Sequence, residues 1–443
     1  LRMSSTERQI LSLSVSYLSS SPSSLLLLSS GAASSLSFSS LLPPSSITLS
    51  SSLASLPTGV DVIVSDQFLN DEKIIDDADA LDSFANAILR SLREGGVLLL
   101  RENLAQNEAS ARSQLSALTA FFDVFRVNED GDQRNLLGFE FYATDQIDAS
   151  IHEKQNWLDI LWVLRKKHFE KPAESAAAVT FRDFLDKTQY TNTGIGAYEW
   201  MFGKDFISPG GYDENSRVLS YFPSLEQGRR MLDIGSGIGG GVRQAASVYG
   251  IQVTGVDLSS NMLSDAIVRV HRERDSRVKY TICDALTFAF PPASFDYVFS
   301  RDCIQHISDK ALLFRNIFNS LRPGGTVVIS LYGRGAGEWT EKFKQYVEKR
   351  AYFLLNCAEL SKLATDAGFT DVFTENMTGR FKEILVSEKL RLEKEKADFL
   401  KHYTEQEFAS LTDGWEDKLH YIDADNHNWL LFRARRPDNS TTA

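Results

Sequence analysis

The chain has 443 residues, of which 43% are hydrophobic and 24% charged, and its formal net charge is −12. That length predicts two or three globular domains rather than one. The acidic balance argues against nucleic-acid and anionic-membrane partners, which need a basic surface, but leaves room for a small anionic ligand held by a few cations. No run of about eighteen apolar residues occurs, so no membrane insertion is expected.

The cysteine content indicates where the protein works. The three cysteines, at positions 283, 303 and 357, lack metal-ligand spacing. An odd, low count is typical of a reducing compartment without disulfides, so we expect a cytoplasmic protein and no metal. The apolar stretch 10–28 is crowded with serine and has no basic region before it. We therefore interpret it as structured protein rather than a signal peptide.

The first half of the chain is a faint copy of the second. Short apolar runs predict strands, and a helix–turn–strand pattern covers residues 88–100. The matching pairs are 26–31 with 232–237, 47–51 with 253–257, 61–65 with 296–300, and 88–100 with 317–329. The apolar strands survive in the first copy, but most loop glycines and two acids do not. We therefore expect residues 1–150 to be a degenerate Rossmann-like domain without a cofactor motif, and a non-catalytic scaffold is one interpretation of it.

Two charged segments are predicted to be helical. Residues 151–188 are rich in tryptophan, leucine and charge, and we interpret them as a helical linker between two domains. Residues 383–399 form a second charged helix near the C-terminus, most simply a solvated face with ion pairs four residues apart.

The second half shows a regular alternation of strands and helices. Strands are predicted at 230–234, 251–257, 278–282, 295–300 and 326–331, and helices at 242–249, 261–274 and 312–321. Such alternation predicts an α/β domain with a parallel sheet and crossover helices.

A glycine loop joins the first of these strands to its helix. Gly235, Gly237 and Gly240 satisfy the dinucleotide-binding pattern, which alone is weak evidence and leaves an NAD-binding interpretation open. Three acids favour S-adenosylmethionine (SAM) instead: Asp233 before the loop, Asp257 at the end of the next strand, and Asp284 after the third. Asp257 is placed to accept the ribose hydroxyls and Asp284 the adenine amino group. This ordered set resembles class I SAM-dependent methyltransferases; another nucleotide or an inactive copy are the alternatives.

Further motifs make a more specific resemblance. Residues 189–194, 198–203, 206–211, 300–306, 350–352 and 413–418 are similar to the phosphoethanolamine N-methyltransferases. The match covers nearly all of residues 189–443, which we therefore expect to form the catalytic SAM-dependent methyltransferase domain. The family makes phosphocholine by successive methylation of an ethanolamine phosphate, using SAM and releasing S-adenosylhomocysteine, without a metal.

The resemblance implies roles for individual residues. His306 is the implied base, Tyr190 closes the site over the ligands, and Asp302 orients the amine. A base is needed because an ammonium with a pKa of about 9 to 10 is mostly protonated at pH 7 and has no free lone pair. By itself His306 would more simply be a structural histidine, and the surrounding motif reverses that reading. The implied cofactor contacts are Ile207, Ser208, Asp233, Gly235, Gly237, Asp257, Leu258, Asp284, Ala285 and Arg301.

The phosphate end of the substrate needs cations and hydroxyl donors. The resemblance assigns this end, with the neighbouring amine site, to Gln189, Tyr190, Tyr198, Asp302, Tyr332, Tyr346, Arg350, Tyr352 and Lys418. Tyr346 and Arg350 are four residues apart, so one helix face presents both, whereas Tyr352 needs a local turn to join them. Residues 189–211 are expected to close over the ligands as a lid.

The position of the implied active domain suggests a substrate range. An active domain behind a degenerate one resembles the nematode-type enzyme of the family, which implies methylation of phosphomonomethylethanolamine and phosphodimethylethanolamine. The alternative is a small-molecule methyltransferase with another acceptor, such as a sterol or a free amine. An apolar acceptor would not need Arg350 and Lys418.

Overall fold

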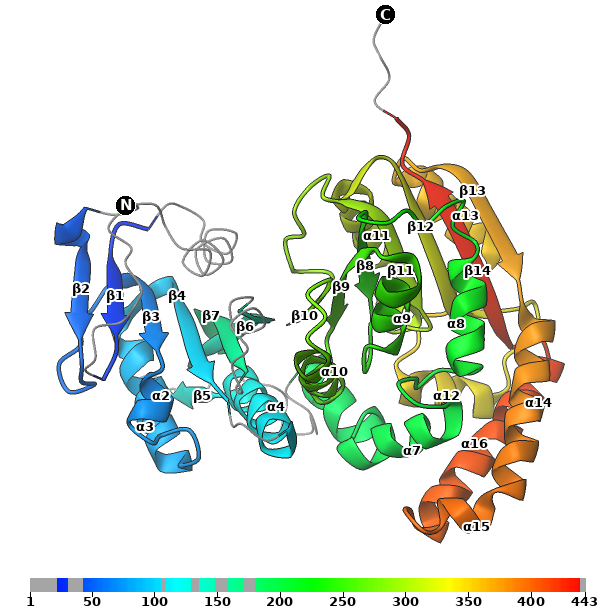
Figure 1. Cartoon of the computed structure of the whole chain (residues 1–443), viewed down its shortest axis with the longest axis horizontal. Helices are drawn as coiled ribbons and strands as arrows, with labels where there is room; N and C mark the ends of the chain where they lie inside the picture. The colour runs from blue at the N-terminus through cyan, green and yellow to red at the C-terminus, as the bar shows by residue number, and fades with distance from the viewer. Residues whose placement is uncertain are drawn as a thin grey trace, which may run out of the picture. The chain divides into compact units, whose positions relative to one another are not determined.

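The computed structural model describes residues 22–30, 43–104, 108–128, 135–147, 158–170 and 180–438. The chain divides into two compact units, whose elements are labelled in Figure 1. The N-terminal unit holds residues 1–188 with 259–276 and 280–289, and the C-terminal unit holds 189–258, 277–279 and 290–443. Most of the stretch 10–28 lies outside the described residues, but its end forms the buried strand β1 (Leu25–Leu28).

The C-terminal unit contains a mixed sheet in the order β13-β14-β12-β11-β8-β9. Strands β8, β9, β11 and β12 run parallel, whereas β14 runs antiparallel between β12 and β13. All residues of β11 are buried, as expected of a central strand covered on both faces. This confirms the predicted Rossmann-like α/β class. The strand bounds are β8 Arg230–Ile234, β9 Gln252–Asp257, β11 Phe295–Arg301, β12 Leu321–Arg334, β13 Thr370–Asn376 and β14 His427–Arg435.

Helices connect these strands and extend the unit beyond its sheet. Gly250, at φ 66°, ends α9 as predicted, because its left-handed backbone turns the chain into β9. The helices are α7 Asn192–Phe202, α8 Gly211–Leu219, α9 Gly240–Tyr249, α11 Lys310–Ser320, α12 Glu341–Arg350, α13 Cys357–Asp366, α14 Thr378–Lys394, α15 Lys396–Phe399 and α16 Glu405–Asp423.

The N-terminal unit contains strands in the order β10-β6-β7-β4-β3-β1-β2, with β5 (Arg126–Asn128) paired to β6. The first four strands of the chain run parallel, and β6, β7 and β10 add antiparallel pairs. The remaining bounds are β2 Ile47–Ser50, β3 Val60–Asp66, β4 Leu92–Asn103, β6 Asn135–Gln146, β7 Asp159–Glu170, β10 Val278–Cys283, η1 Pro44–Ser46, α2 Phe68–Asp71, α3 Ala78–Ser91, α4 Glu108–Val124, α6 Phe181–Phe184 and α10 Ser260–Glu273, followed after α6 by the π-helical turn Leu185–Gln189.

The predicted helical linker at 151–188 is wrong over most of its described part. Residues 159–170 form β7, which pairs along its length with β4 and β6. The run 160–164 is buried at every position. A strand covered on both faces shows no alternation, so its apolar run was indistinguishable from a buried helix by pattern alone. Residues 148–157 and 171–179 lie outside the described residues.

The internal repeat is visible in backbone detail. In both copies a helix runs directly into a strand, and a Gly-Gly pair follows near the start of that strand. The first glycine of each pair has positive φ: 70° at Gly95 in β4 and 78° at Gly324 in β12. A Cβ on the second glycine would lie 2.9 Å from a carbonyl oxygen three residues earlier in both Gly96 and Gly325. Only glycine fits such a close approach.

The charged C-terminal helix forms as two pieces, α14 and α15. Its ion pairs include Lys389 with Glu393 at 2.9 Å and Arg391 with Glu395 at 3.2 Å, four residues apart as predicted. In the part of the chain that the structure describes, no helix is long and apolar enough to cross a membrane.

Candidate active site

The glycine loop between β8 and α9 approaches its neighbours too closely for side chains. A Cβ on Gly235 (φ 81°) would lie 2.2 Å from the Cys303 side chain, and one on Gly240 would lie 2.0 Å from the Asp205 carbonyl oxygen. The backbone N–H of Gly237 donates to Asp257 Oδ2 over 2.9 Å. Glycine is therefore required at these positions for the loop to pack against Cys303 and Asp205, and the loop fixes the acid at the end of β9.

Two acids flank this loop. Burial, together with the charge of Asp257, raises the pKa of Asp233 to about 8, and Arg301 opposes the rise. Asp233 and Asp257 are 4% and 9% exposed. Because two buried carboxylates repel one another, a ligand that carries positive charge and hydroxyl donors would be stabilised here. SAM has both, so the residues present fit it.

Two of the predicted cofactor contacts belong to the N-terminal unit. Asp284 and Ala285 belong to the segment 280–289 of the N-terminal unit, where Asp284 Oδ1 accepts from the backbone N–H of Leu286 over 2.8 Å. Leu258 directly follows Asp257 in the C-terminal unit. The site described below is built from C-terminal-unit residues.

The segment that was predicted to contact SAM is fastened from two sides. The buried guanidinium of Arg301 donates to the carbonyl oxygens of Gly211, over 3.1 Å, and of Pro209. Glu388 Oε1 of α14 accepts from the Gly210 backbone N–H at 2.7 Å. Ile207 and Ser208 precede this clamp and are half-buried. The clamp fixes the backbone of residues 209–211 without occupying the two side chains before it.

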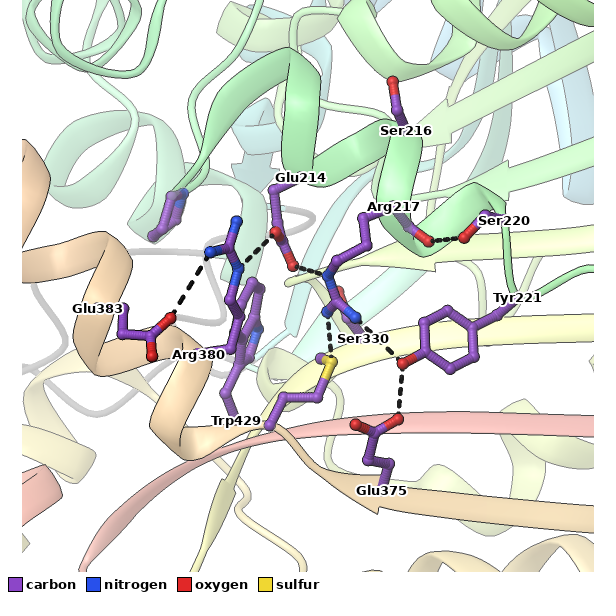
Figure 2. A network of polar contacts seen from close by, with 12 residues as sticks. Glu214, Ser216, Arg217, Ser220, Tyr221, Ser330, Glu375, Arg380, Glu383 and Trp429 are labelled. Atoms are coloured by element: carbon purple, nitrogen blue, oxygen red, sulfur yellow. Dashed lines mark hydrogen bonds and ion pairs between the residues drawn. The ribbon is translucent and has the colours of Figure 1, made fainter.

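A polar network anchors the helix that follows this segment. Figure 2 shows Glu214 of α8 joined to two guanidiniums, those of Arg217 at 2.7 Å and Arg380 at 3.3 Å. Arg217 also donates to Tyr221 Oη over 3.1 Å, and Tyr221 donates to Glu375 over 2.6 Å. Because Glu214 is 1% exposed, its two cationic partners are what make its burial tolerable. α8 is thereby fixed to β13 and α14.

The predicted catalytic pair comes together. Tyr190 Oη lies 3.5 Å from His306 Nε2, although the two residues are 116 positions apart. His306 sits in a short 3-10 turn, Ile304–His306, and is 8% exposed. Burial and then the charge of Arg350 lower the pKa of His306 to about 4. The imidazole is therefore neutral at physiological pH and has a lone pair to accept a proton.

Asp302 follows β11 in a left-handed conformation, φ 53°. Its Oδ1 accepts from Trp429 Nε1 at 2.6 Å and from Ser330 Oγ at 3.0 Å. Its Oδ2 has no hydrogen-bond partner among the described residues and lies 3.9 Å from Arg301 Nε. Burial raises the pKa of Asp302, whereas Arg301 and the two hydrogen bonds oppose the rise.

Three tyrosines predicted to bind phosphate form one aromatic cluster. The ring centroids of Tyr332 and Tyr352 are 5.9 Å apart, and those of Tyr346 and Tyr352 are 5.8 Å apart. The local turn that Tyr352 requires is made by Ala351, whose φ of 51° ends α12. The Tyr352 N–H then bonds the Val347 carbonyl over 3.0 Å, which brings the ring back toward Tyr346.

Two cations border the cluster. Although burial opposes it, the neighbouring hydroxyls of Tyr352, Tyr198 and Tyr346 raise the pKa of Arg350. Gln189 Nε2 donates to the Arg350 carbonyl over 3.1 Å. Lys418 Nζ lies 5.5 Å from the Tyr332 ring centroid, and burial and the charge of Arg350 lower its pKa to about 8. Two cations that repel each other, surrounded by phenol hydroxyls, are suited to an oxyanion such as phosphate.

Sequence reasoning missed three residues of this site: His427, Trp429 and Glu388. His427 is fully buried, with Nε2 3.4 Å from Tyr346 Oη, and Trp429 bonds Asp302. Both lie on β14, and the only signal was a polar histidine at the start of an apolar strand. Among the described residues, no group of three His, Cys, Asp or Glu side chains could hold a metal ion.

Comparison with protein families gives two matches. Residues 4–170 match the family described as phosphoethanolamine N-methyltransferase 2 N-terminal, and residues 232–329 match a methyltransferase domain. The N-terminal unit therefore has a family of its own, despite having lost the loop glycines.

Comparison with individual proteins gives matches over most of the chain. Phosphoethanolamine N-methyltransferase 2 of Caenorhabditis elegans is 50% identical over 395 residues, 89% of each chain. The enzyme of Plasmodium falciparum is 34% identical over 258 residues, 58% of this chain and 96% of its own. A solved structure of Haemonchus contortus phosphoethanolamine N-methyltransferase 2, with phosphomonomethylethanolamine and S-adenosylhomocysteine, is 44% identical, covers 98% of this chain and 99% of its own, and gives a TM-score of 0.88.

Proposed function

This chain belongs to the phosphoethanolamine N-methyltransferase family and is a SAM-dependent methyltransferase, and from that premise we propose how its C-terminal unit methylates phosphobases. The proposed substrates are phosphomonomethylethanolamine and phosphodimethylethanolamine, and the product of the second step is phosphocholine. The observation that carries the proposal is the Tyr190–His306 pair, at 3.5 Å, in a unit that also surrounds Arg350 with three tyrosine hydroxyls.

SAM supplies a methyl group on a sulfonium sulfur, and the S–CH3 bond breaks as the amine nitrogen forms the new N–CH3 bond, leaving S-adenosylhomocysteine. The chain's first task is to free the nitrogen lone pair. His306 Nε2 takes the ammonium proton. Its pKa, lowered to about 4, leaves the imidazole neutral with a free lone pair but makes it a weak base, so the proposed step needs the bound phosphate to raise that pKa. Tyr190, beside Nε2, orders the acceptor side of the site.

The cationic end of the acceptor needs a fixed negative group. Asp302 Oδ2 has no hydrogen-bond donor among the described residues, so it is the proposed partner of the phosphobase nitrogen. It would accept the N–H that the monomethylated amine keeps after losing its proton, and in both steps it would face the nitrogen that becomes positive. A quaternary nitrogen has no proton to lose, so its positive charge is permanent. The Asp302 carboxylate would stabilise that charge as it forms. Holding the nitrogen in line with the methyl group also removes the entropy cost of a bimolecular encounter.

The phosphate end is proposed to lie on Arg350, Lys418 and the hydroxyls of Tyr198, Tyr332, Tyr346 and Tyr352, with Gln189 supporting Arg350. Binding a dianion here would offset the charge of Arg350, which is one cause of the low pKa of His306. The phosphate thus makes His306 a stronger base when the correct substrate is present. A sterol or free amine as acceptor would bring no anion to Arg350 and Lys418, whose charges repel each other, which disfavours that alternative.

The substrate range is tested by direct assay. Purified full chain is offered phosphoethanolamine, phosphomonomethylethanolamine and phosphodimethylethanolamine, each with SAM, and S-adenosylhomocysteine formation is measured. We expect turnover of the two methylated phosphobases and little of phosphoethanolamine. Strong turnover of phosphoethanolamine would refute the proposed range. The proposed location is the cytoplasm, supported by three cysteines that form no disulfide.

A further inference from the structure

The two oxygens of the Asp302 carboxylate have different surroundings. Oδ1 accepts two hydrogen bonds, from Trp429 Nε1 at 2.6 Å and Ser330 Oγ at 3.0 Å. Oδ2 accepts none from the described residues, although the side chain is only 2% exposed. A buried carboxylate oxygen without a donor is costly unless a ligand supplies one.

We propose that Trp429, assisted by Ser330, is a positioning residue that occupies one oxygen of Asp302 and thereby presents the other to the nitrogen of the phosphobase. This inference rests on the proposed function, because it assumes that Asp302 meets the amine. Trp429 itself touches no reacting atom in this scheme. It determines which oxygen is available and in which direction that oxygen points.

The indole is held too firmly to follow a displaced carboxylate. Trp429 is fully buried on β14, opposite Tyr332 of β12 in the antiparallel register. Its backbone N–H donates to Thr378 Oγ1 over 3.1 Å, and its carbonyl accepts from Met377 over 2.7 Å. Its ring packs on Phe381 with centroids 5.2 Å apart. A donor fixed on both backbone and ring imposes one orientation on its acceptor.

The carboxylate is fixed from the opposite side as well. The Asp302 backbone N–H donates to the Ser330 carbonyl over 2.9 Å, and Ser330 also supplies the second side-chain bond to Oδ1. Ser330 is therefore bonded to both ends of the residue. With φ of Asp302 at 53°, the side chain leaves the strand end in a direction that ordinary extended backbone would not give.

The same bonds influence ionisation. Burial favours the neutral acid, whereas hydrogen bonds from Trp429 and Ser330 favour the carboxylate. The other charged or titratable groups facing Asp302 are Arg301, Glu214, Lys418, Cys303, Tyr332 and Tyr352. Losing the indole donor therefore raises the pKa of Asp302, so the ionised fraction at a given acidic pH falls.

The test compares pH profiles of kcat/KM for phosphodimethylethanolamine in wild type and Trp429→Phe, which keeps an aromatic ring and removes the donor. The acidic limb is expected to move about one unit to higher pH, with kcat/KM on that limb falling about tenfold. The substrate ionises in the same way with wild type and with Trp429→Phe, so its ionisation does not contribute to the difference between the two pH profiles. SAM affinity, measured by calorimetry, is expected to stay the same. Ser330→Ala should move the limb in the same direction by less, and also serves if Trp429→Phe folds poorly.

A matched control separates positioning from general loss of stability. Trp162 of the N-terminal unit is equally buried, and its Nε1 donates to the neutral Thr119 hydroxyl at 3.0 Å. Trp162→Phe should lower the melting temperature without moving the acidic limb. An unmoved limb in both Trp429→Phe and Ser330→Ala overturns the inference.

A further variant distinguishes the inference from its premise. Asp302→Asn keeps the shape of the side chain and removes its charge. If Asp302→Asn retains wild-type kcat/KM, the proposed function of Asp302 itself is wrong. If Asp302→Asn loses activity but the limb of Trp429→Phe stays in place, only the positioning inference is wrong.

Discussion

The strand pairs β3–β4 and β11–β12 are two versions of one structure, alike at one end and different at the other. At the amino ends, Arg93 pairs with Asp61 and Arg322 pairs with Asp296. Both strand pairs also shift register after their first residue. The features that turn a helix into a central strand are kept in both copies. The features shared at the amino ends of these strands are therefore interpreted as serving the fold rather than a ligand site.

The carboxyl ends have diverged. Gln67 and Asp302 occupy matching positions with nearly equal φ, 58° and 53°. The Gln67 side chain accepts from the Asn103 backbone N–H over 2.8 Å, so it is used internally. The fully buried Glu102 carboxylate likewise accepts the backbone N–H groups of Leu69, at 2.8 Å, and Asn70, at 3.2 Å. In the N-terminal unit, the Gln67 and Glu102 side chains bond to the backbone of the chain itself, whereas Asp302, the counterpart of Gln67, is proposed to meet the phosphobase.

The largest expected difference between the two copies is in SAM binding, which is tested by counting the cofactor sites per chain. Asp257 has Ser51 as its counterpart in the first copy. We expect one SAM site per chain by calorimetry, and Asp257→Ala to abolish measurable binding because the ribose hydroxyls lose their acceptor. A second site per chain would show that the first copy still holds cofactor, whereas a single site that survives Asp257→Ala would show that Asp257 is not the ribose acceptor. Ser51→Asp is the matched control and should create no site.

The next largest effect is expected at the base. His306→Asn should lower kcat by about 10²- to 10⁴-fold, since proton removal by a positioned base contributes about that much. The affinity for SAM should change little. A kcat within a few-fold of wild type would show that another group or water takes the proton.

The pKa of His306 gives a related and finer test. In the free protein it is lowered to about 4 by burial and by Arg350. Inorganic phosphate, bound at the phosphate end, should raise that pKa because it offsets the charge of Arg350. NMR titration of the histidine ring carbons, assigned with His306→Asn, measures the shift. An unchanged or lowered pKa would place the phosphate away from Arg350.

A smaller effect is expected at the phosphate end. Arg350→Ala should raise KM for phosphodimethylethanolamine by about 10- to 100-fold, the cost of losing a charge-assisted bond in a buried site. The kcat value should fall less, because the reacting nitrogen lies at the other end of the substrate. Unchanged KM would contradict the phosphate assignment and reopen the sterol or free-amine alternative.

The smallest effect is expected at the amino ends of the two strand pairs, where both copies have an arginine–aspartate ion pair. Arg93 and Arg322 are 34% and 42% exposed, so each of their ion pairs should contribute no more than about 1 kcal/mol. Arg93→Ala and Arg322→Ala should lower the free energy of unfolding by similar small amounts, and neither should alter KM. Denaturant titration gives the energies. A selective loss of activity in Arg322→Ala would mean that this pair serves the site as well as the fold.

Much of the fold could be predicted because its signals are local. The strands around the glycine loop are short apolar runs, and Gly250 ends its helix in the predicted place. β7 was missed because burial on both faces erases alternation. His427, Trp429 and Glu388 were missed because their partners lie 81 to 178 positions away, and no spacing rule connects such residues. Tyr190 and His306 were found only because a family motif joins them.

The Arg301 side chain connects the two proposed binding sites. It holds the carbonyl oxygens of Pro209 and Gly211 and also lies 3.9 Å from Asp302 Oδ2. One cation thus links the segment 209–211, which follows the proposed SAM contacts, to the carboxylate that is proposed to meet the acceptor. If bound SAM changes the affinity for the acceptor by some factor through this cation, bound acceptor must change the affinity for SAM by the same factor. Through the Arg301 guanidinium, the binding affinities of the two substrates would therefore be coupled before the methyl transfer begins.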